Sequence, residues 1–146
     1  MNKKETTKQI IFYLIDKLGD KIEGKKKLMK LMFLTEHYDF DKNKLVPEMS
    51  VGNTFCIYYY GVFSREVMRC SDELIEEKEI IEGFPLKSKK KGELGKEIKE
   101  RVDKIISIFG KKSGYDLENE TLKMMKIEPY EKEKYFGQEV SSLIKK

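Results

Sequence analysis

The sequence predicts a mainly α-helical fold: a compact domain of five to six helices, with a small antiparallel β element between helices two and four that is winged-helix-like in part. Amphipathic runs with apolar residues at helical spacing recur along most of the chain. Strand signals are confined to residues 55–60 and 79–82. The length of 146 residues suits one domain over 1–146, large enough to form a core without disulfides.

The first two helices are expected over residues 6–18 and 25–39. The first carries an apolar stripe that ends at Leu18, and Gly19 follows in the usual position for a helix C-cap. The second begins with lysines and then carries an apolar face so wide that it must be covered on most sides. The sequence therefore places residues 25–39 at the centre of the core.

An aromatic strand and a turn follow. Residues 55–60 are rich in aromatic and β-branched side chains, and Gly61 ends the run as a turn residue. Ser64 is placed to cap a third helix over residues 64–78. We expect residues 79–82 to form a second strand that pairs with the first in one small antiparallel sheet.

The remainder of the chain is again helical by pattern. Residues 87–92 read as a solvated basic loop, and residues 93–109 form a clearly amphipathic helix. Ser113 is a good N-cap for a fifth helix. A C-terminal helix is expected over 127–146, and nothing in the sequence suggests a linker that would divide the domain.

Composition places the protein among cytoplasmic globular domains. The net charge of +4 is too small to indicate nucleic-acid binding by itself. The polar N-terminus does not resemble a signal peptide, and no apolar run approaches the roughly 20 residues that span a bilayer. The two cysteines, Cys56 and Cys70, lack the spacing of a metal site and are expected to be buried and reduced.

No catalytic, cofactor or metal site is recognisable, so we do not expect an enzyme. His37 is the only histidine, and a metal site needs several converging ligands. Its position near a helix C-terminus, where the dipole favours a cation, is the simpler interpretation. The sequence also lacks a glycine-rich phosphate loop and a nucleophile elbow.

A winged-helix-like DNA-binding regulator is an alternative, because the order helix, helix, strand, helix, strand and basic loop is similar to that fold. The helix that would enter the major groove, residues 64–78, carries more acidic than basic residues and would be repelled by phosphates. The basic residues that would serve this alternative lie elsewhere: they are Lys26, Lys30, Lys87, Lys89, Lys90 and Lys91.

Two motifs resemble a known family. Residues 27–34, Lys-Leu-Met-Lys-Leu-Met-Phe-Leu, precede residues 58–64, Tyr-Tyr-Tyr-Gly-Val-Phe-Ser. Their order and spacing are similar to those of the Panacea domain of SocA-like antitoxins and their uncharacterised archaeal and bacterial relatives. In that family a KLQKLLYF helix precedes a W-x-YGP strand and turn. The resemblance covers residues 6–126. It departs from the family where Gly61-Val62 replaces Gly-Pro and where the tryptophan is missing.

The resemblance implies a non-catalytic domain that binds another protein, which in antitoxin members is a toxin encoded nearby. Exposed aromatic residues around the turn and the basic start of the second helix are the expected contact surface. The residues that we expect to contact the partner are Lys25, Lys27, Lys30, Tyr58, Tyr60, Phe63, Arg65 and Arg69. A third hypothesis is a homodimer formed through residues 131–146.

Overall fold

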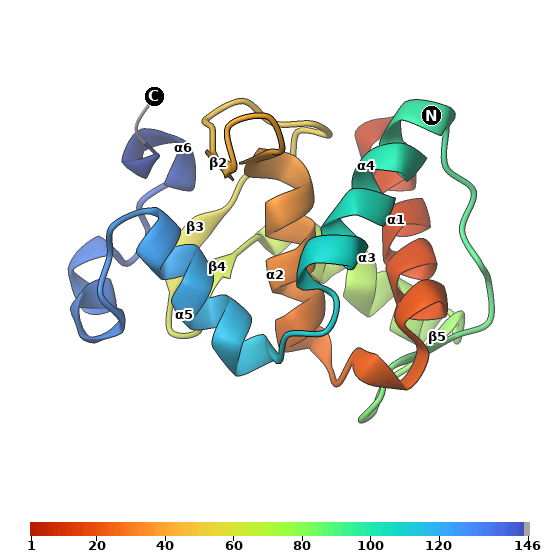
Figure 1. Cartoon of the computed structure of the whole chain (residues 1–146). Coiled ribbons are helices and arrows are strands. Elements are labelled where there is room, and N and C mark those ends of the chain that lie inside the picture. Colours follow the sequence, from red (N-terminus) through yellow and green to blue (C-terminus); the bar gives the residue numbers. More distant parts are fainter. Residues whose placement is uncertain (145–146) are drawn as a thin grey trace.

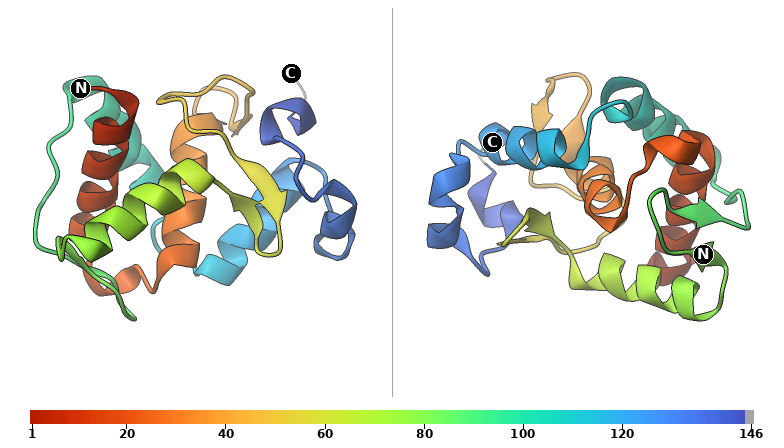
Figure 2. Two further views of the ribbon diagram at one scale, coloured as in Figure 1. Left: turned by 180° about the vertical axis from the view of Figure 1, so that it is seen from behind. Right: turned by 90° about the horizontal axis from the view of Figure 1, so that it is seen from below.

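The computed structural model describes residues 1–144 and confirms a mainly helical fold with small antiparallel sheets. Figures 1 and 2 show its arrangement. The helices, with 3-10 segments written η, are α1 (Lys3–Leu18), η1 (Gly19–Lys21), α2 (Lys25–His37), α3 (Arg65–Glu76), α4 (Lys96–Phe109), α5 (Gly114–Met124), η2 (Pro129–Tyr135) and α6 (Val140–Leu143). The strands are β1 (Tyr38–Asp39), β2 (Lys44–Leu45), β3 (Cys56–Tyr58), β4 (Gly61–Phe63), β5 (Ile80–Ile81) and β6 (Lys87–Ser88).

Helix α2 lies at the centre of the molecule, as its wide apolar face predicts. Figure 1 shows α2 between α1 and α4 on one side and α5 on the other, and the helix also contacts α3 and β4. Every residue from Lys27 to His37 is buried. Because neighbours cover α2 on most of its circumference, its side chains form the middle of the core regardless of the direction in which they point.

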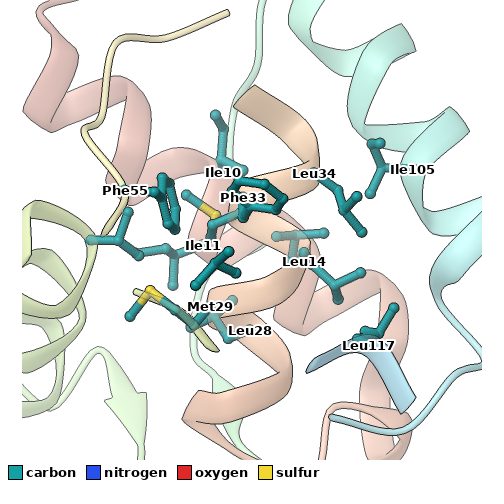
Figure 3. Close-up of a cluster of buried hydrophobic side chains, with 14 of the residues drawn as sticks. Ile10, Ile11, Leu14, Leu28, Met29, Phe33, Leu34, Phe55, Ile105 and Leu117 are labelled. Carbon is teal, nitrogen blue, oxygen red and sulfur yellow. The ribbon is translucent and has the colours of Figure 1, made fainter. Parts of the chain in front are cut away.

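The core around α2 brings together side chains from most of the chain (Figure 3). Phe33 of α2 meets Phe55 edge to face, with ring centroids 5.5 Å apart. Ile10 and Leu14 of α1 and Ile105 of α4 are completely buried in the same cluster. Burial of one such side chain contributes about 1.5–3 kcal/mol. This cluster therefore fixes α2 as the support for the segments that follow it.

The predicted N-termini of α3 and α5 are confirmed, and in both a serine side chain caps the helix. The Ser64 side chain accepts a hydrogen bond from the backbone N–H of Val67, and that of Ser113 accepts one from Asp116. The first helix begins earlier than expected, at Lys3, because the Asn2 side chain caps it by accepting from Glu5.

The expected pairing of residues 55–60 with residues 79–82 is wrong. Strand β3 pairs with β4 and strand β5 pairs with β6, so each is a local antiparallel pair in a sheet of its own. The physical reason is that Gly61 adopts φ +85°, which reverses the chain at once and lets residues 61–63 satisfy the backbone of β3.

The C-terminal segment is not the single helix expected over 127–146, of which residues 145–146 lie outside the described residues. It forms the 3-10 segment η2 and the short helix α6, with Gly137 at φ +84° between them. Its backbone bonds to β3 and to the residue before it: the N–H of Gly137 donates to the Ile57 carbonyl, and the N–H of Val140 donates to the Phe55 carbonyl. The segment therefore covers β3. Within residues 1–144 no helix has the length and apolar character to cross a bilayer.

The loop that leads into β3 is held by one buried carboxylate. Glu36, near the end of α2, accepts hydrogen bonds from the backbone N–H groups of Val51, Gly52 and Asn53 at 2.7, 3.0 and 2.7 Å. The Asn53 side chain donates in turn to the Thr7 hydroxyl of α1 at 2.9 Å. These bonds fix the loop against two helices, and so they set where β3 begins.

Candidate functional site

Two lysines of α2 are buried although lysine is rarely found inside a protein. Lys27 and Lys30 are three positions apart and each has 2% of its surface exposed. The ammonium group of Lys27 donates to the backbone carbonyls of Lys21 and Gly110 at 2.6 and 2.7 Å. Lys27 therefore joins the ends of η1 and α4 to α2, which is a structural role.

The β3–β4 hairpin lies between α2 and α5 (Figure 1), and its Val62 carbonyl accepts a hydrogen bond from Lys30, the second of these lysines. Ile57 and Val62 are paired across the hairpin and are completely buried. The neighbouring side chains point to the opposite face, where the rings of Tyr58 and Phe63 meet edge to face with centroids 5.7 Å apart. Strand alternation therefore divides the hairpin into a core face and an aromatic face.

The aromatic face encloses a pocket of about 290 Å³, which we call the hairpin pocket. It is lined by Lys30, Tyr58, Tyr59, Tyr60, Val62, Phe63 and Arg65. Its walls are almost entirely aromatic and aliphatic, and its two charged residues are both cationic. A pocket of this size accommodates about one large side chain or a small molecule.

Lys30 is the buried charge of this pocket. Its ammonium donates to the Val62 carbonyl at 3.0 Å. An ammonium has three donors, and none of the carboxylates whose side chains the structure describes forms an ion pair with this one. Burial lowers the pKa of Lys30 from its ordinary value of 10.5 to about 7, although Glu118 nearby raises it. Near neutral pH the group is therefore poised between its charged and neutral forms.

A charged cluster closes the α5 side of the hairpin. The buried carboxylate of Glu118 forms ion pairs with Lys26 at 2.6 Å and Lys132 at 2.8 Å. The Lys26 ammonium lies over the rings of Tyr60 and Tyr115, at 5.1 and 5.8 Å from their centroids. These two lysines lower the pKa of the Glu118 carboxyl against the opposing effect of burial, which is the largest. The cluster holds the turn residue Tyr60 in place.

The residues predicted to contact a partner are partly brought together. Tyr58, Tyr60, Phe63, Arg65 and Lys30 all line the hairpin pocket. Arg69 is exposed on the next turn of α3 after Arg65. The other two predicted residues are engaged within the chain, because Lys27 is buried as described above and Lys25 pairs with Asp72 and Glu82.

The residues assigned to the DNA-binding alternative do not form one surface. Lys30 is buried and Lys26 is paired with Glu118. The lysines at 87, 89, 90 and 91 are exposed on and after β6, which packs beside α1 rather than beside the hairpin (Figure 2). The predicted basic residues are therefore divided between the interior and two separate places on the surface.

Sequence reasoning missed three residues of this region. Tyr59 was left out although it is 72% exposed and its ring lies 4.9 Å from that of Phe136. Glu118 and Lys132 lie 14 positions apart, and no local pattern links them to the hairpin. One available signal was Lys30 itself, since a lysine inside a helix that is apolar on nearly all sides must be buried.

The described His, Cys, Asp and Glu side chains do not form a candidate metal site. Among the side chains that the structure describes, no group of three His, Cys, Asp or Glu residues could hold a metal ion. His37 lies at the C-terminal end of α2 as expected, but it is completely buried, and burial lowers its pKa and so disfavours the charged form. Its Nδ1 lies 2.9 Å from the Val46 carbonyl. Cys70 is buried as expected, whereas Cys56 is only half-buried.

No protein-family model, no curated protein and no solved structure matches this chain. The function must therefore be argued from the hairpin pocket and from the sequence motifs.

Gly61→Ala tests the geometry of the hairpin. A side chain at φ +85° is strained, and the added Cβ would lie 3.1 Å from the Glu118 side chain. We expect the variant to lose about 1–3 kcal/mol of unfolding free energy in urea denaturation. Gly95→Ala is the matched control, because its φ is −60° and, apart from the residue itself and its chain neighbours, nothing lies within 4 Å of the added Cβ. Equal stability of the two variants would contradict the proposed turn.

Proposed function

We propose that the protein is a cytoplasmic, non-catalytic binding module of antitoxin type, which binds and neutralises a partner protein encoded nearby. The hairpin pocket is the docking site, and an apolar side chain of the partner occupies it. The observation that carries the proposal is an apolar pocket between the aromatic face of the hairpin and the buried Lys30.

The composition of the pocket favours a protein partner. Tyrosine and arginine are enriched where interfaces have their strongest contacts. Tyr59 and Tyr60 are 72% and 68% exposed. They lie at the mouth of the pocket together with Arg65, which is also exposed. The aromatic rings offer apolar area that loses little side-chain entropy on binding, and Arg65 offers planar hydrogen bonding.

The antitoxin part of the proposal rests on the motif resemblance. The helix motif, residues 27–34, forms the centre of the core, and the strand-and-turn motif, residues 58–64, lines the hairpin pocket. In the structure the two motifs meet at one hydrogen bond, from Lys30 to the Val62 carbonyl. A protein that shares both motifs would therefore be expected to form the same pocket.

Co-expression tests this function. A host that expresses the open reading frame adjacent to this gene should stop growing, and simultaneous expression of this chain should restore growth. The two proteins should also co-purify. A harmless neighbour that does not co-purify would overturn the antitoxin assignment.

Tyr60→Ala combined with Arg65→Glu should weaken partner binding by about tenfold or more, because it removes an aromatic contact and reverses a charge at the pocket mouth. Calorimetric titration with the co-purified partner measures the effect. Tyr130→Ala with Lys123→Glu is the matched control, since both residues are exposed and neither lines the pocket. If the Tyr60/Arg65 variant unfolds cooperatively and binds with full affinity, the pocket is not the docking site.

A further inference from the structure

We propose that the hairpin pocket recognises a carboxylate attached to an apolar group, and that its occupant is the C-terminal residue of the partner, with a side chain such as that of leucine. This inference rests on the proposed function, since it names the chemistry of the partner at the same site. It follows from three properties of the pocket: the charge of Lys30, the position of Arg65 and the apolar walls.

The first property is an unbalanced buried cation. Lys30 is 2% exposed and gives one hydrogen bond, to the Val62 carbonyl. Glu118, the carboxylate that raises the pKa of Lys30, already pairs with Lys26 and Lys132. The ammonium therefore retains donors without a negative partner among the described side chains. An anion that entered the pocket would supply one.

The second property is a second cation at the mouth. Arg65 is exposed and lines the pocket, and it forms no ion pair with any residue of the described chain. A guanidinium binds a carboxylate through two parallel hydrogen bonds. Lys30 inside and Arg65 outside therefore give the pocket a positive charge that an uncharged apolar side chain alone would leave unmatched.

The third property is size together with apolar walls. The rings of Tyr58 and Phe63 line a space of about 290 Å³, which one residue fills. An apolar residue that also carries a carboxylate must end a chain, because internal residues carry an amide there. Capture of a terminal carboxylate is a known mode of peptide recognition.

Proton linkage gives an independent signature. The pKa of Lys30 is about 7, and a bound carboxylate would raise it by favouring the charged form. Glu118 of α5 favours the charged form as well, whereas Lys26 of α2 and Lys132 of η2 oppose it. Affinity for a carboxylate should therefore fall by about tenfold or more between pH 7 and pH 9, as the free amine loses its proton.

The test uses two small probes that differ only in charge, N-acetyl-L-leucine and N-acetyl-L-leucinamide. Chemical shifts of the full chain are followed while each probe is added. We expect the acid to bind with a dissociation constant on the order of 1 mM, at least tenfold more tightly than the amide at pH 7, with shifts confined to the hairpin pocket. Acetate, which lacks the apolar group, should bind more weakly than the acid.

Lys30→Met should reduce the preference for the acid over the amide at least severalfold, with Arg65 retaining the remainder, while Lys123→Met, which changes an exposed lysine of α5, should leave the preference intact. Equal binding of acid and amide at the pocket would overturn the carboxylate inference and leave the docking pocket standing. Binding of neither probe, or shifts elsewhere on the surface, would overturn it too. A strong preference for the acid combined with a non-toxic neighbour would instead refute only the antitoxin assignment.

Discussion

Glu36→Ala is expected to lower the unfolding free energy by about 3–5 kcal/mol, the largest loss among the substitutions considered. The carboxylate accepts three backbone hydrogen bonds from the loop before β3, and a buried donor left without a partner costs about 1–3 kcal/mol. The estimate is the lower part of the range of about 3–9 kcal/mol for three full penalties, because Val51 and Gly52 are partly exposed and water can reach them.

Urea denaturation at pH 7 measures this loss. Glu36→Gln keeps one oxygen and should lie between the native protein and Glu36→Ala, which provides a measurement even if the alanine variant does not fold. Glu100→Ala is the control, because Glu100 is exposed on α4. A change of less than about 1 kcal/mol in Glu36→Ala would mean that the loop does not depend on this carboxylate. In that case Glu36 would not be needed to position β3 and the hairpin pocket either.

Lys30→Met should make the unfolding free energy of the protein less dependent on pH. The folded protein has a pKa of about 7 at this position against 10.5 for an ordinary lysine. Between these values the unfolded chain binds more protons, so the stability of the native protein rises with pH. Between pH 7 and pH 9 the gain is about 2 kcal/mol. Methionine cannot titrate, so the stability of the variant relative to the native protein should fall by that amount over this range.

At pH 7 we expect Lys30→Met to be at least as stable as the native protein. Methionine fills a similar volume and removes a buried charge, which outweighs the hydrogen bond lost by the Val62 carbonyl. Urea denaturation of both proteins at pH 7 and pH 9 gives the difference directly. Lys123→Met controls for the loss of a surface lysine. A difference that is the same at both pH values would contradict the depressed pKa.

The sequence predicted those features of the fold that local patterns determine. Ser64 and Ser113 start helices because their hydroxyls accept from the backbone three residues later. The wide apolar face of residues 25–39 correctly indicated a central helix. These features depend on spacing within one segment, so they can be recognised without knowledge of the partners.

The sequence misled where the backbone conformation at a glycine decided the outcome, at Gly61 and at Gly137. The pairing of β3 with β4 depends on the left-handed backbone of Gly61, and the choice between this local partner and residues 79–82 was not visible in the side-chain pattern. The interruption by Gly137 was available in the sequence and was overlooked.

The candidate site was predictable in part for the same reason. Tyr58, Tyr60, Phe63 and Arg65 are close in sequence, and the structure places them in one pocket. The addition of Lys30 requires α2 to pack against β4. The pairing of Glu118 with Lys132 requires α5 to pack against η2. Neither contact can be recognised from the spacing of residues within one segment of the sequence.

The most direct test of the hairpin pocket as a binding site is the titration of Lys30, followed through its side-chain carbon-13 resonances with and without saturating N-acetyl-L-leucine. We predict a pKa of about 7 in the free protein and a clearly higher value when the acid is bound. A pKa near 10.5 in the free protein, or a pKa that the acid does not change, would contradict the claim that Lys30 is a buried amine whose charged form is stabilised by a bound carboxylate.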